Sequence, residues 1–495
     1  MTHFLKEFLT PKSIAVYGAN NKGAGIGSFQ LMGLIVSGFK GKIYPIHLKL
    51  DSVMGYKAYK SISDVPEVPD LVIVILPPKV VPQVFEECGE KGVKRIVLIS
   101  GGFRELGGDR TNTLREEIQK IAKKYGIRFI GPNCLGIYNS WIYPDDPSSA
   151  LNTAIWEKQQ RGYFSIASQS GTLASHIFFD PENLDLGISR SLSLGNEADI
   201  DVVDCLEFYK DDEKTKAIGL YIEELKRAKT FLRVAKEITP RKPIITIYVG
   251  GSEAAQRAVK SHTGSLAGNA KIYDAAFKEA GVVKTELVTE FLDLARVLTK
   301  EIYPKGKRLG IITNSGGPGV MIANHAEKQG LKVPRLSEQL RTELREYAIP
   351  TASLKNPIDT TFDMNFQNYY INIPKTLMQS GEIDAIMMYG VFGFQDVLKK
   401  LMENERVAQY EDFPDQVKQD LPLEKMLVSP LLKMSKKFSI PVFLINPQNY
   451  NSPWSKRIRS TGAILFQYWD RPVRCLAKLC EYSQYRRKMV EKKSP

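Results

Sequence analysis

Apolar and polar positions repeat one order three times along the chain. Each time a β-branched apolar run is followed by a turn rich in glycine and serine, and then by a segment whose apolar residues have helical spacing. The three runs and their turns are residues 13–17 and 18–28, 163–167 and 168–172, and 309–313 and 314–319. The repetition predicts that each run opens a separate domain.

Further apolar runs alternate with helical segments after each opening. Residues 71–76 and 95–99 predict strands, and residues 81–90 between them predict a helix. Short strands that are apolar on both faces indicate parallel sheets covered by helices on both sides. We therefore predict an α/β fold with three doubly wound parallel-sheet domains. The predicted segments are 1–138, 139–302, 303–470 with an inserted helical region at 394–437, and a basic C-terminal tail at 471–495.

Length and composition agree with this organisation. A chain of 495 residues is too long for one hydrophobic core and favours about three domains. No apolar run approaches the roughly 20 residues of a membrane span, and the N-terminus lacks the features of a signal peptide, so we expect a cytoplasmic protein with no membrane association. The five cysteines are scattered singly without a CxxC pair, which predicts reduced thiols and no metal site.

The formal net charge of +13 allows three kinds of partner: nucleic acid, an acidic protein subunit, or a polyanionic ligand such as CoA or ATP. The chain has no aromatic stripe of the RNA-recognition type, no zinc finger and no basic zipper. We therefore expect no nucleic acid among its partners.

The three glycine- and serine-rich turns are candidate anion sites. Ligands of open parallel sheets bind beyond the carboxyl ends of the strands, where the N–H groups of a following helix attract phosphate. A tight turn that needs glycine for its backbone explains any one of them equally well, but three in one chain favour phosphate handling. In the first turn Gly23, Gly25 and Gly27 fit a dinucleotide fingerprint, yet the strand at 42–47 ends without the carboxylate that NAD requires. Another adenine-containing cofactor fits better.

His262 is the candidate for acid–base or nucleophilic chemistry. The chain has only five histidines, and this one lies among small residues in the segment 260–268, where phosphate can approach a ring nitrogen closely. A lone histidine in a helix-rich region is more often structural. The residues alone leave both roles open.

Several stretches together resemble a known family. They are Gly131 to Gly136, Ser168 to Gly171, Ser193 to Asp199, Tyr221 to Glu223, Ser261 to Gly268, and Asn314 to Gly319. With them the chain resembles the α subunit of the NDP-forming acyl-CoA synthetases, specifically the ADP-forming acetate–CoA ligases related to succinyl-CoA synthetase. The resemblance implies a CoA-binding Rossmann domain followed by two flavodoxin-like domains.

The resemblance also implies a reaction and a partner. Acyl-CoA, ADP and phosphate would be interconverted with a carboxylic acid, CoA and ATP through an acyl phosphate and a phosphohistidine. ADP or ATP and Mg²⁺ would bind an ATP-grasp module, and the three predicted domains leave no room for one in this chain. We therefore expect a separate β subunit, in an α2β2 heterotetramer.

The resemblance further assigns roles to individual residues. His262 would carry the phosphoryl group, and Glu223, rather than the adjacent Glu224, would hydrogen-bond its imidazole. The expected phosphate-binding residues are Ser168, Gln169, Ser170, Gly171, Thr172, Asn314, Ser315, Gly316, Gly317 and Gly319. The expected CoA-binding residues are Gly18, Ala19, Asn20, Gly25, Gly27, Ser28, Pro45, Leu76, Pro77, Pro78, Ser100, Gly101, Gly102, Asn133 and Cys134.

The sequence departs from the family pattern at three places. His47 lies where a lysine or asparagine is usual, Gly250–Gly251 lies where a Gly-Arg pair is usual, and residues 140–156 are atypical. Two alternatives follow from the same fold. One is a non-catalytic CoA-sensing regulatory module, which typically lacks the histidine that is present here. The other is an NAD-dependent dehydrogenase, against which the missing carboxylate argues.

Overall fold

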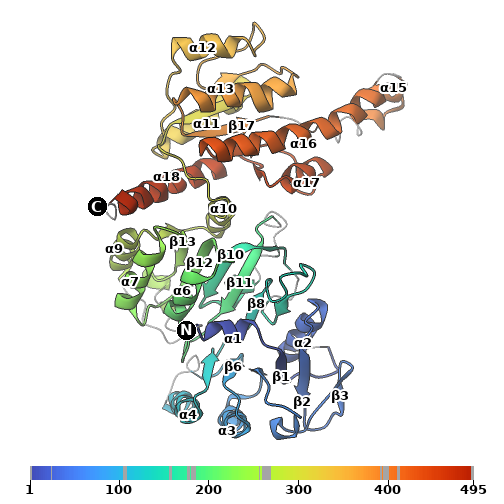
Figure 1. The fold of residues 1–495 in the computed structure, drawn as a ribbon, viewed down its shortest axis with the longest axis vertical. Coiled ribbons are helices and arrows are strands. Elements are labelled where there is room, and N and C mark those ends of the chain that lie inside the picture. Colours follow the sequence, from blue (N-terminus) through green and yellow to red (C-terminus); the bar gives the residue numbers. More distant parts are fainter. Residues whose placement is uncertain are drawn as a thin grey trace. The chain divides into compact units, whose positions relative to one another are not determined.

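The computed structural model of the chain describes residues 3–23, 25–103, 109–154, 159–175, 179, 185–255, 257–258, 269–390, 393, 401–409 and 413–491, without the side chains of 109–112 and 413–424. The chain divides into two compact units, Met1–Phe291 and Leu292–Pro495 (Figure 1). The first unit contains two large sheets and the second contains one. The predicted phosphate carrier, His262, lies outside the described residues.

The first sheet has five parallel strands in the order β2-β1-β5-β6-β7. These strands are β1 (Ser13–Tyr17), β2 (Lys42–Ile46), β5 (Leu71–Val74), β6 (Arg95–Leu98) and β7 (Arg128–Ile130), joined by helices α2 (Ile26–Val36), α3 (Val81–Lys91) and α4 (Asp109–Tyr125). All residues of β1 and β5 are buried, as strands covered on both faces require. Because β1 lies between β2 and β5, the strand order reverses there and opens a crevice at the strand ends.

Shorter elements complete this part of the first unit. They are α1 (Leu5–Leu9), the hairpin β3 (Ser52–Val53) and β4 (Tyr56–Lys57), and the 3₁₀ turns η1 (Ile62–Asp64) and η2 (Pro78–Val80). The predicted strands and the predicted helix at 81–90 agree with β1, β2, β5, β6 and α3 to within two residues at each end.

The second sheet has seven strands in the order β14-β13-β12-β10-β11-β8-β9. Five are parallel: β10 (Arg161–Ser168), β11 (Ile188–Ser193), β12 (Ala217–Ile222), β13 (Ile244–Tyr248) and β14 (Val283–Thr285). The edge strands β8 (Ile137–Asn139) and β9 (Leu151–Asn152) are antiparallel, so this sheet is mixed and not wholly parallel. Its helices are α5 (Gly171–Ser175), α6 (Val202–Asp211), α7 (Ala228–Ile238) and α9 (Ala270–Ala280), and the boundary between the two units falls within α10 (Val288–Leu298).

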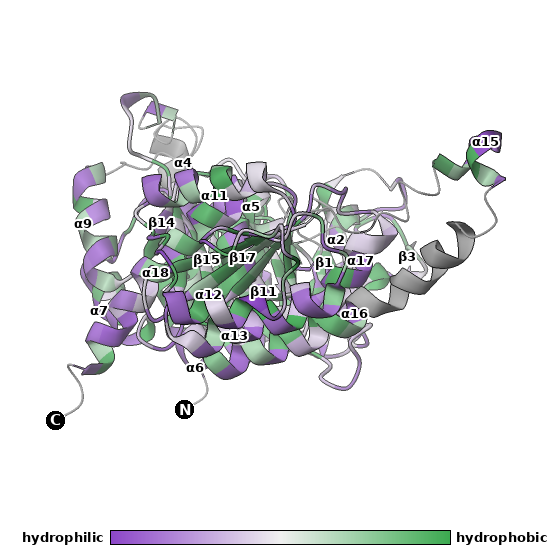
Figure 2. Cartoon of the chain, turned by 90° about the horizontal axis from the view of Figure 1, so that it is seen from above, coloured by the Kyte–Doolittle hydropathy of each residue, from purple (hydrophilic) through white to green (hydrophobic). Residues whose placement is uncertain are grey.

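The third sheet, in the second unit, has five parallel strands in the order β16-β15-β17-β18-β19. The strands are β15 (Leu309–Thr313), β16 (Ile358–Asp359), β17 (Ala385–Tyr389), β18 (Val442–Ile445) and β19 (Ile464–Phe466). The other elements are α11 (Gly316–Lys328), α12 (Glu338–Arg345), the π-helical turn η5 (Asn368–Asn372), α13 (Ile373–Ser380), α15 (Glu405–Ala408), α16 (Phe413–Phe438), α17 (Pro453–Ser460) and α18 (Asp470–Glu491). Figure 2 shows apolar residues gathered on strands and mixed polarity on helices, as amphipathic covering layers require.

Two charged segments of the second unit are helical and contribute apolar residues to its core. Within the predicted insertion, α16 buries Leu427, Val428 and Leu431 in the core of the third sheet. Residues 470–491 of the predicted basic tail form α18, which buries Leu476 and Leu479 among others. Within the described residues, no helix is both long and apolar enough to cross a membrane.

Candidate functional site

A pocket of about 600 Å³ lies at the carboxyl ends of β1, β2 and β5, where the strand order of the first sheet reverses. Four predicted CoA-binding residues line it, namely Gly18, Ala19, Asn20 and Leu76. Lys49 and Lys60, which the sequence analysis did not single out, also line it. A mostly apolar pocket with two lysines at a topological switch point suits an adenine-containing polyanion.

Close backbone packing shapes the turn after β1. Gly18 has φ +91°, and a Cβ there would lie 2.1 Å from the carbonyl oxygen of Ile75. A Cβ on Gly27 would lie 2.3 Å from the carbonyl oxygen of Gly18, so α2 begins directly against the turn. The Ser28 hydroxyl bonds both the N–H and the carbonyl of Asn20, each at 3.1 Å. Gly27 and Ser28 therefore hold the turn in its conformation. Gly25 immediately precedes α2, and a Cβ there would meet no atom within 4 Å.

His47 has a defined conformation at the edge of the pocket. Its Nδ1 accepts the backbone N–H groups of Lys49 and Leu50, both at 3.1 Å. The imidazole thus caps its own turn as an asparagine side chain does, which accounts for histidine at a position where the family has a lysine or asparagine. Pro45 lies inside β2 beside Val16 and does not line the pocket, whereas its neighbour Ile46 does.

The ends of β5, β6 and β7 bring the other predicted CoA residues together. The Leu76 N–H donates to the Ser100 hydroxyl at 2.9 Å, and the Ser100 carbonyl accepts the Asn133 N–H at 3.0 Å. A Cβ on Gly101 would lie 3.3 Å from Oδ1 of Asn133. Pro78 begins η2, whose last residue, Val80, lines the pocket. Pro77 and Gly102 adjoin these groups in sequence.

Cys134 is structural in this arrangement. Its thiol is 3% exposed and donates to the carbonyl of Leu98 at 3.3 Å. Burial raises the pKa of Cys134 to about 12. A thiol that stays protonated cannot act as a nucleophile. The Cys134 side chain therefore stabilises the loop that carries it.

Two of the stretches that carry the family resemblance lie against each other. The N–H groups of Asn196 and Ala198 donate to the carbonyls of Pro132 and Gly131, both at 2.9 Å. The Leu135 N–H donates to the Ser193 hydroxyl at 2.9 Å. These contacts join the end of the first sheet to the second sheet within one compact unit.

The turn after β10 is held by its own side chains. The Ser168 hydroxyl donates to the Ser170 carbonyl at 2.6 Å and accepts the Ser170 N–H at 3.1 Å. A Cβ on Gly171 would lie 2.7 Å from Cγ of Leu135, so α5 begins tightly against the neighbouring loop. Thr172, in the first turn of α5, is exposed.

Gln169 connects this turn to Glu223. Its Oε1 accepts the N–H groups of Glu223 and Glu224 at 2.6 and 3.1 Å, and its Nε2 donates to the carbonyl of Glu224 at 2.8 Å. Glu223 is 6% exposed at the end of β12, and burial together with this carboxylate raises the pKa of Tyr221 to about 12. The structure therefore brings Gln169 and Glu223 together and fixes the backbone beneath the carboxylate, while their predicted roles at phosphate and at His262 stay predictions.

The turn after β15 belongs to the second unit. Its side chains form fewer hydrogen bonds within the turn than those of the turn after β10. The Asn314 backbone is bonded to Tyr389 and Phe362, but its buried Oδ1 has no hydrogen-bond partner among the described residues. Ser315 precedes α11 without a side-chain cap. A Cβ on Gly317 would meet nothing within 4 Å. A helix start with free N–H groups and an open face is suited to bind an anion.

Comparison with known proteins assigns the chain to a family. Residues 12–140 match the family described as CoA binding domain, and residues 161–298 match the Succinyl-CoA ligase like flavodoxin domain. The chain is 41% identical over 383 residues to the acetate–CoA ligase [ADP-forming] II subunit alpha of Pyrococcus furiosus, covering 77% of this chain and 81% of that one. It belongs to the α-subunit family of ADP-forming acetate–CoA ligases.

Other members of the family extend the comparison. The acetate–CoA ligase [ADP-forming] of Methanocaldococcus jannaschii is 42% identical over 360 residues, but the chain spans only 49% of its length. The solved structure of acetyl-coenzyme A synthetase 1 from Ca. Korarchaeum cryptofilum, in complex with phosphate and ADP, matches over the full length of both chains with a TM-score of 0.80 and 29% identity. The α/β fold and the family resemblance predicted from sequence are thereby confirmed.

Residues that the sequence analysis missed surround the family motifs. Glu197 lies inside the 193–199 stretch and is 4% exposed, and Lys226 follows Glu223 by three positions. Asp359 lies near the turn after β15, with Oδ2 3.2 Å from the position of a Cβ on Gly316. In the sequence, Glu197 follows Gly195 within the family motif at 193–199, and this position is the feature that could have indicated a role for it. In the part of the chain that the structure describes, no group of three or more His, Cys, Asp or Glu side chains could hold a metal ion.

Proposed function

We propose that this chain is the CoA-binding subunit of an ADP-forming acyl-CoA synthetase. The enzyme interconverts acyl-CoA, ADP and phosphate with a carboxylic acid, CoA and ATP, through an acyl phosphate and a phosphohistidine at His262. The named activities of its relatives favour this function over a regulatory module of the same fold. The acid that it uses would be a small carboxylic acid.

One observation carries the proposal. The pocket lined by Gly18 and the bond between Gln169 and Glu223 belong to the same compact unit, and direct backbone contacts between residues 131–136 and 193–199 connect the two regions. A thioester ligand and a phosphoryl-transfer site placed on one rigid scaffold can pass an acyl phosphate without losing it to water.

The first step is attack by phosphate on the thioester. A phosphate oxygen bonds to the acyl carbon, the C–S bond breaks, and CoA leaves as the thiolate. Here the turn at Gly18 to Asn20 would hold the CoA phosphates through backbone N–H groups, and Lys49 would add positive charge at the pocket, where Lys60 is paired with Asp51. Ser100 and Asn133 would fix the adjoining loops near the thioester.

The second step transfers the phosphoryl group to His262. The imidazole nitrogen bonds to phosphorus, the bond from phosphorus to the acyl oxygen breaks, and the carboxylate leaves. Glu223 would accept a hydrogen bond from the other ring nitrogen and stabilise the cationic ring. The turn at Ser168 to Thr172 would hold the phosphoryl oxygens through N–H groups at a helix start, and the turn at Asn314 to Gly319 offers an anion site of the same kind in the second unit.

The last step requires a partner. We propose a separate β subunit of the ATP-grasp type, assembled as α2β2, which binds ADP or ATP and Mg²⁺ and receives the phosphoryl group. A relative named as a subunit alpha covers most of this chain, and the M. jannaschii relative is about twice as long as the region it shares with this chain, which supports a division into two chains. Mg²⁺ would serve on the partner to neutralise phosphate charge.

Phosphate labelling tests the proposal. Incubation of the chain with acyl-CoA and radiolabelled phosphate should label it in a form that is stable to base and labile to acid. The variant His262→Asn should not be labelled, while His325→Asn, a histidine on α11, should be labelled like the parent chain. Undiminished labelling of His262→Asn would rule out this phosphate carrier, and absence of labelling in the parent chain would rule out the reaction.

A further inference from the structure

Glu197 is a buried carboxyl group that the mechanism above does not use. It lies in the loop between β11 and α6, is 4% exposed and adopts φ +49°, which is uncommon for a residue other than glycine. Lys226 holds the loop in place, because its Nζ donates to the carbonyls of Asn196 and Glu197 at 2.7 and 2.5 Å. An acidic side chain that is buried and has an uncommon backbone conformation is a candidate for a functional role.

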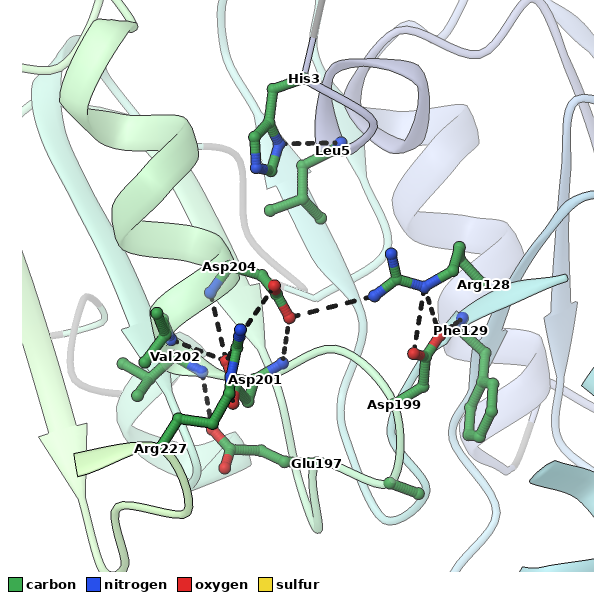
Figure 3. Close-up of polar contacts among 12 residues, drawn as sticks. His3, Leu5, Arg128, Phe129, Glu197, Asp199, Asp201, Val202, Asp204 and Arg227 are labelled. Atoms are coloured by element: carbon green, nitrogen blue, oxygen red, sulfur yellow. Dashed lines mark hydrogen bonds and ion pairs between the residues drawn. The ribbon is translucent and has the colours of Figure 1, made fainter. Parts of the chain in front are cut away.

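The Glu197 carboxyl group meets two donors. Oε1 accepts the Val202 N–H at 3.0 Å (Figure 3), and the side chain of Gln169 lies near enough to the carboxyl group to favour its ionised form. Gln169 has two amide hydrogens, of which one donates to the carbonyl of Glu224. Because Oε1 of Gln169 accepts backbone N–H groups, the amide has one orientation only, and its second hydrogen is available to Glu197.

Charged groups surround Glu197 from each neighbouring segment. Lys226 favours its ionised form, Asp201 at the start of α6 opposes it, and Asp204 and Arg227 pair with each other beside them. Cys205 of α6 lies in the same environment. Burial outweighs Lys226 and raises the pKa of Glu197 to about 8. The carboxyl group therefore changes its charge close to neutral pH.

We propose that Glu197 is a positioning residue for the phosphohistidine step, whose ionised carboxylate orients Gln169 and thereby fixes the strand end that carries Glu223. This inference rests on the proposed function. An ionised carboxylate has two oxygens to accept the N–H groups of Val202 and Gln169, whereas the protonated acid must use one oxygen as a donor. The support of Gln169 is complete only when Glu197 is ionised.

The consequence is a dependence of phosphoryl transfer on the ionisation of Glu197. The rate of His262 labelling should contain a component that rises between about pH 7 and 9, because the carboxylate forms in that range. Glu197→Gln cannot ionise and presents one acceptor oxygen. It should lose this component and label about tenfold more slowly than the parent chain at the upper end of the range, since small displacements of positioning groups cost at least that much.

The experiment measures single-turnover labelling of the full chain with acyl-CoA and radiolabelled phosphate from pH 6 to 9, for the parent chain, Glu197→Gln, Glu197→Ala and Asp199→Asn. Asp199 is the matched control in the same loop, because its carboxylate instead accepts from Arg128 and the Phe129 N–H (Figure 3). Asp199→Asn should keep the pH-dependent component even if it lowers stability. Calorimetry with CoA should give the same affinity for the parent chain and Glu197→Gln.

The outcomes separate the inference from the function beneath it. A parent chain that is not labelled overturns the proposed function. A labelled parent chain whose pH profile is shared by Glu197→Gln overturns the role of Glu197 alone. Loss of labelling in Glu197→Ala with partial recovery in Glu197→Gln, which keeps one acceptor, supports the positioning role. Equal loss of CoA affinity and labelling in all Glu197 variants shows a general structural role and overturns it.

Discussion

The two turns expected to hold the phosphoryl group differ in how they use their polar atoms. After β10, Ser168 bonds Ser170, and Gln169 bonds three backbone groups of Glu223 and Glu224, so the turn is occupied by its own structure. After β15, Asn314 has a buried Oδ1 without a hydrogen-bond partner among the described residues. The first turn precedes the five-residue helix α5 and the second precedes the thirteen-residue helix α11.

This contrast indicates a division of roles. Polar atoms that are satisfied within the protein stabilise a fixed geometry, whereas N–H groups at a helix start that no side chain caps, as at Ser315 before α11, can bind an anion. The turn after β10 would therefore position Glu223 and its surroundings, while the turn after β15 would bind phosphate more directly. Substitutions in the first turn should lower stability, and those in the second should lower ligand affinity.

The largest expected effect concerns Glu197, the buried carboxyl group near Gln169 of the first turn. Burial raises the pKa of Glu197 above the ordinary value of a glutamate, so the folded state binds its proton more tightly than the unfolded state does. The stability from this group is complete below the ordinary pKa and is lost as pH rises through about 8. The loss approaches about 1.4 kcal/mol per pH unit within that window.

Urea unfolding at pH 5, 7 and 9 measures this effect. The parent chain should lose stability relative to Glu197→Gln as pH rises, because glutamine does not titrate. A difference between the two chains that stays constant with pH would contradict the burial of an ionisable Glu197. The result would also measure how much unfolding free energy the protein loses when Glu197 ionises, as the positioning role requires.

Removal of the Gln169 side chain should have the next largest effect. Gln169→Ala leaves two N–H groups and one carbonyl without this partner, and at about 1 kcal/mol for each hydrogen bond it should lower the unfolding free energy by about 3 kcal/mol. Gln339 is a suitable control, because its side chain bonds only the exposed Glu343. Gln339→Ala should change stability by less than about 0.5 kcal/mol. Equal effects of the two substitutions would show that the hydrogen bonds of Gln169 do not stabilise the turn after β10.

A matched pair of glycine substitutions compares the two turns directly. A Cβ on Gly171 would lie 2.7 Å from Leu135, so Gly171→Ala should destabilise the protein by about 1–3 kcal/mol. A Cβ on Gly317 would meet no atom within 4 Å, so Gly317→Ala should stabilise it by about 0.4–1 kcal/mol. Thermal unfolding of both variants measures the difference. Destabilisation by Gly317→Ala would show that the second turn is as closely packed as the first.

The sequence predicts the order of elements better than it predicts which polar atoms are satisfied. The apolar runs locate β1, β10 and β15, because strands covered on both faces need apolar residues throughout. The basic end of the chain concealed α18, whose buried Leu476 and Leu479 have helical spacing. The acidic residue Glu197 was not singled out, because its burial depends on the folded structure. Gln169, which lies near its carboxyl group, is distant in sequence, and the bond from the Val202 N–H forms only when the loop folds back on α6.

The candidate site shows the same limit. Of the residues in the family motifs, Gly18 lines the pocket and Gln169 bonds the backbone of Glu223, while their roles in binding CoA and phosphate stay predictions. They do not distinguish Pro45, which lies within β2, or Cys134, whose buried thiol supports a loop, from residues that face a ligand. A motif records which residues recur together, whereas contact with a ligand depends on the direction of each side chain.

The smallest change in stability is expected for Asn314→Ala. Its Oδ1 is buried without a partner among the described residues, so removing it forfeits no hydrogen bond through that atom and relieves an unsatisfied group. The unfolding free energy should change by less than about 1 kcal/mol, against the larger loss expected for Gln169→Ala. If phosphate binds at this turn, the Nδ2 amide of Asn314 would be the group that donates to it, and the same variant should bind phosphate about tenfold more weakly, as the loss of one good polar contact predicts. Phosphate protection against thermal unfolding, compared between Asn314→Ala and the parent chain, measures both quantities in one series. Unchanged protection by phosphate would show that Asn314 does not face the ligand, and the unsatisfied oxygen would then mark a structural defect in the second turn and not a phosphate site.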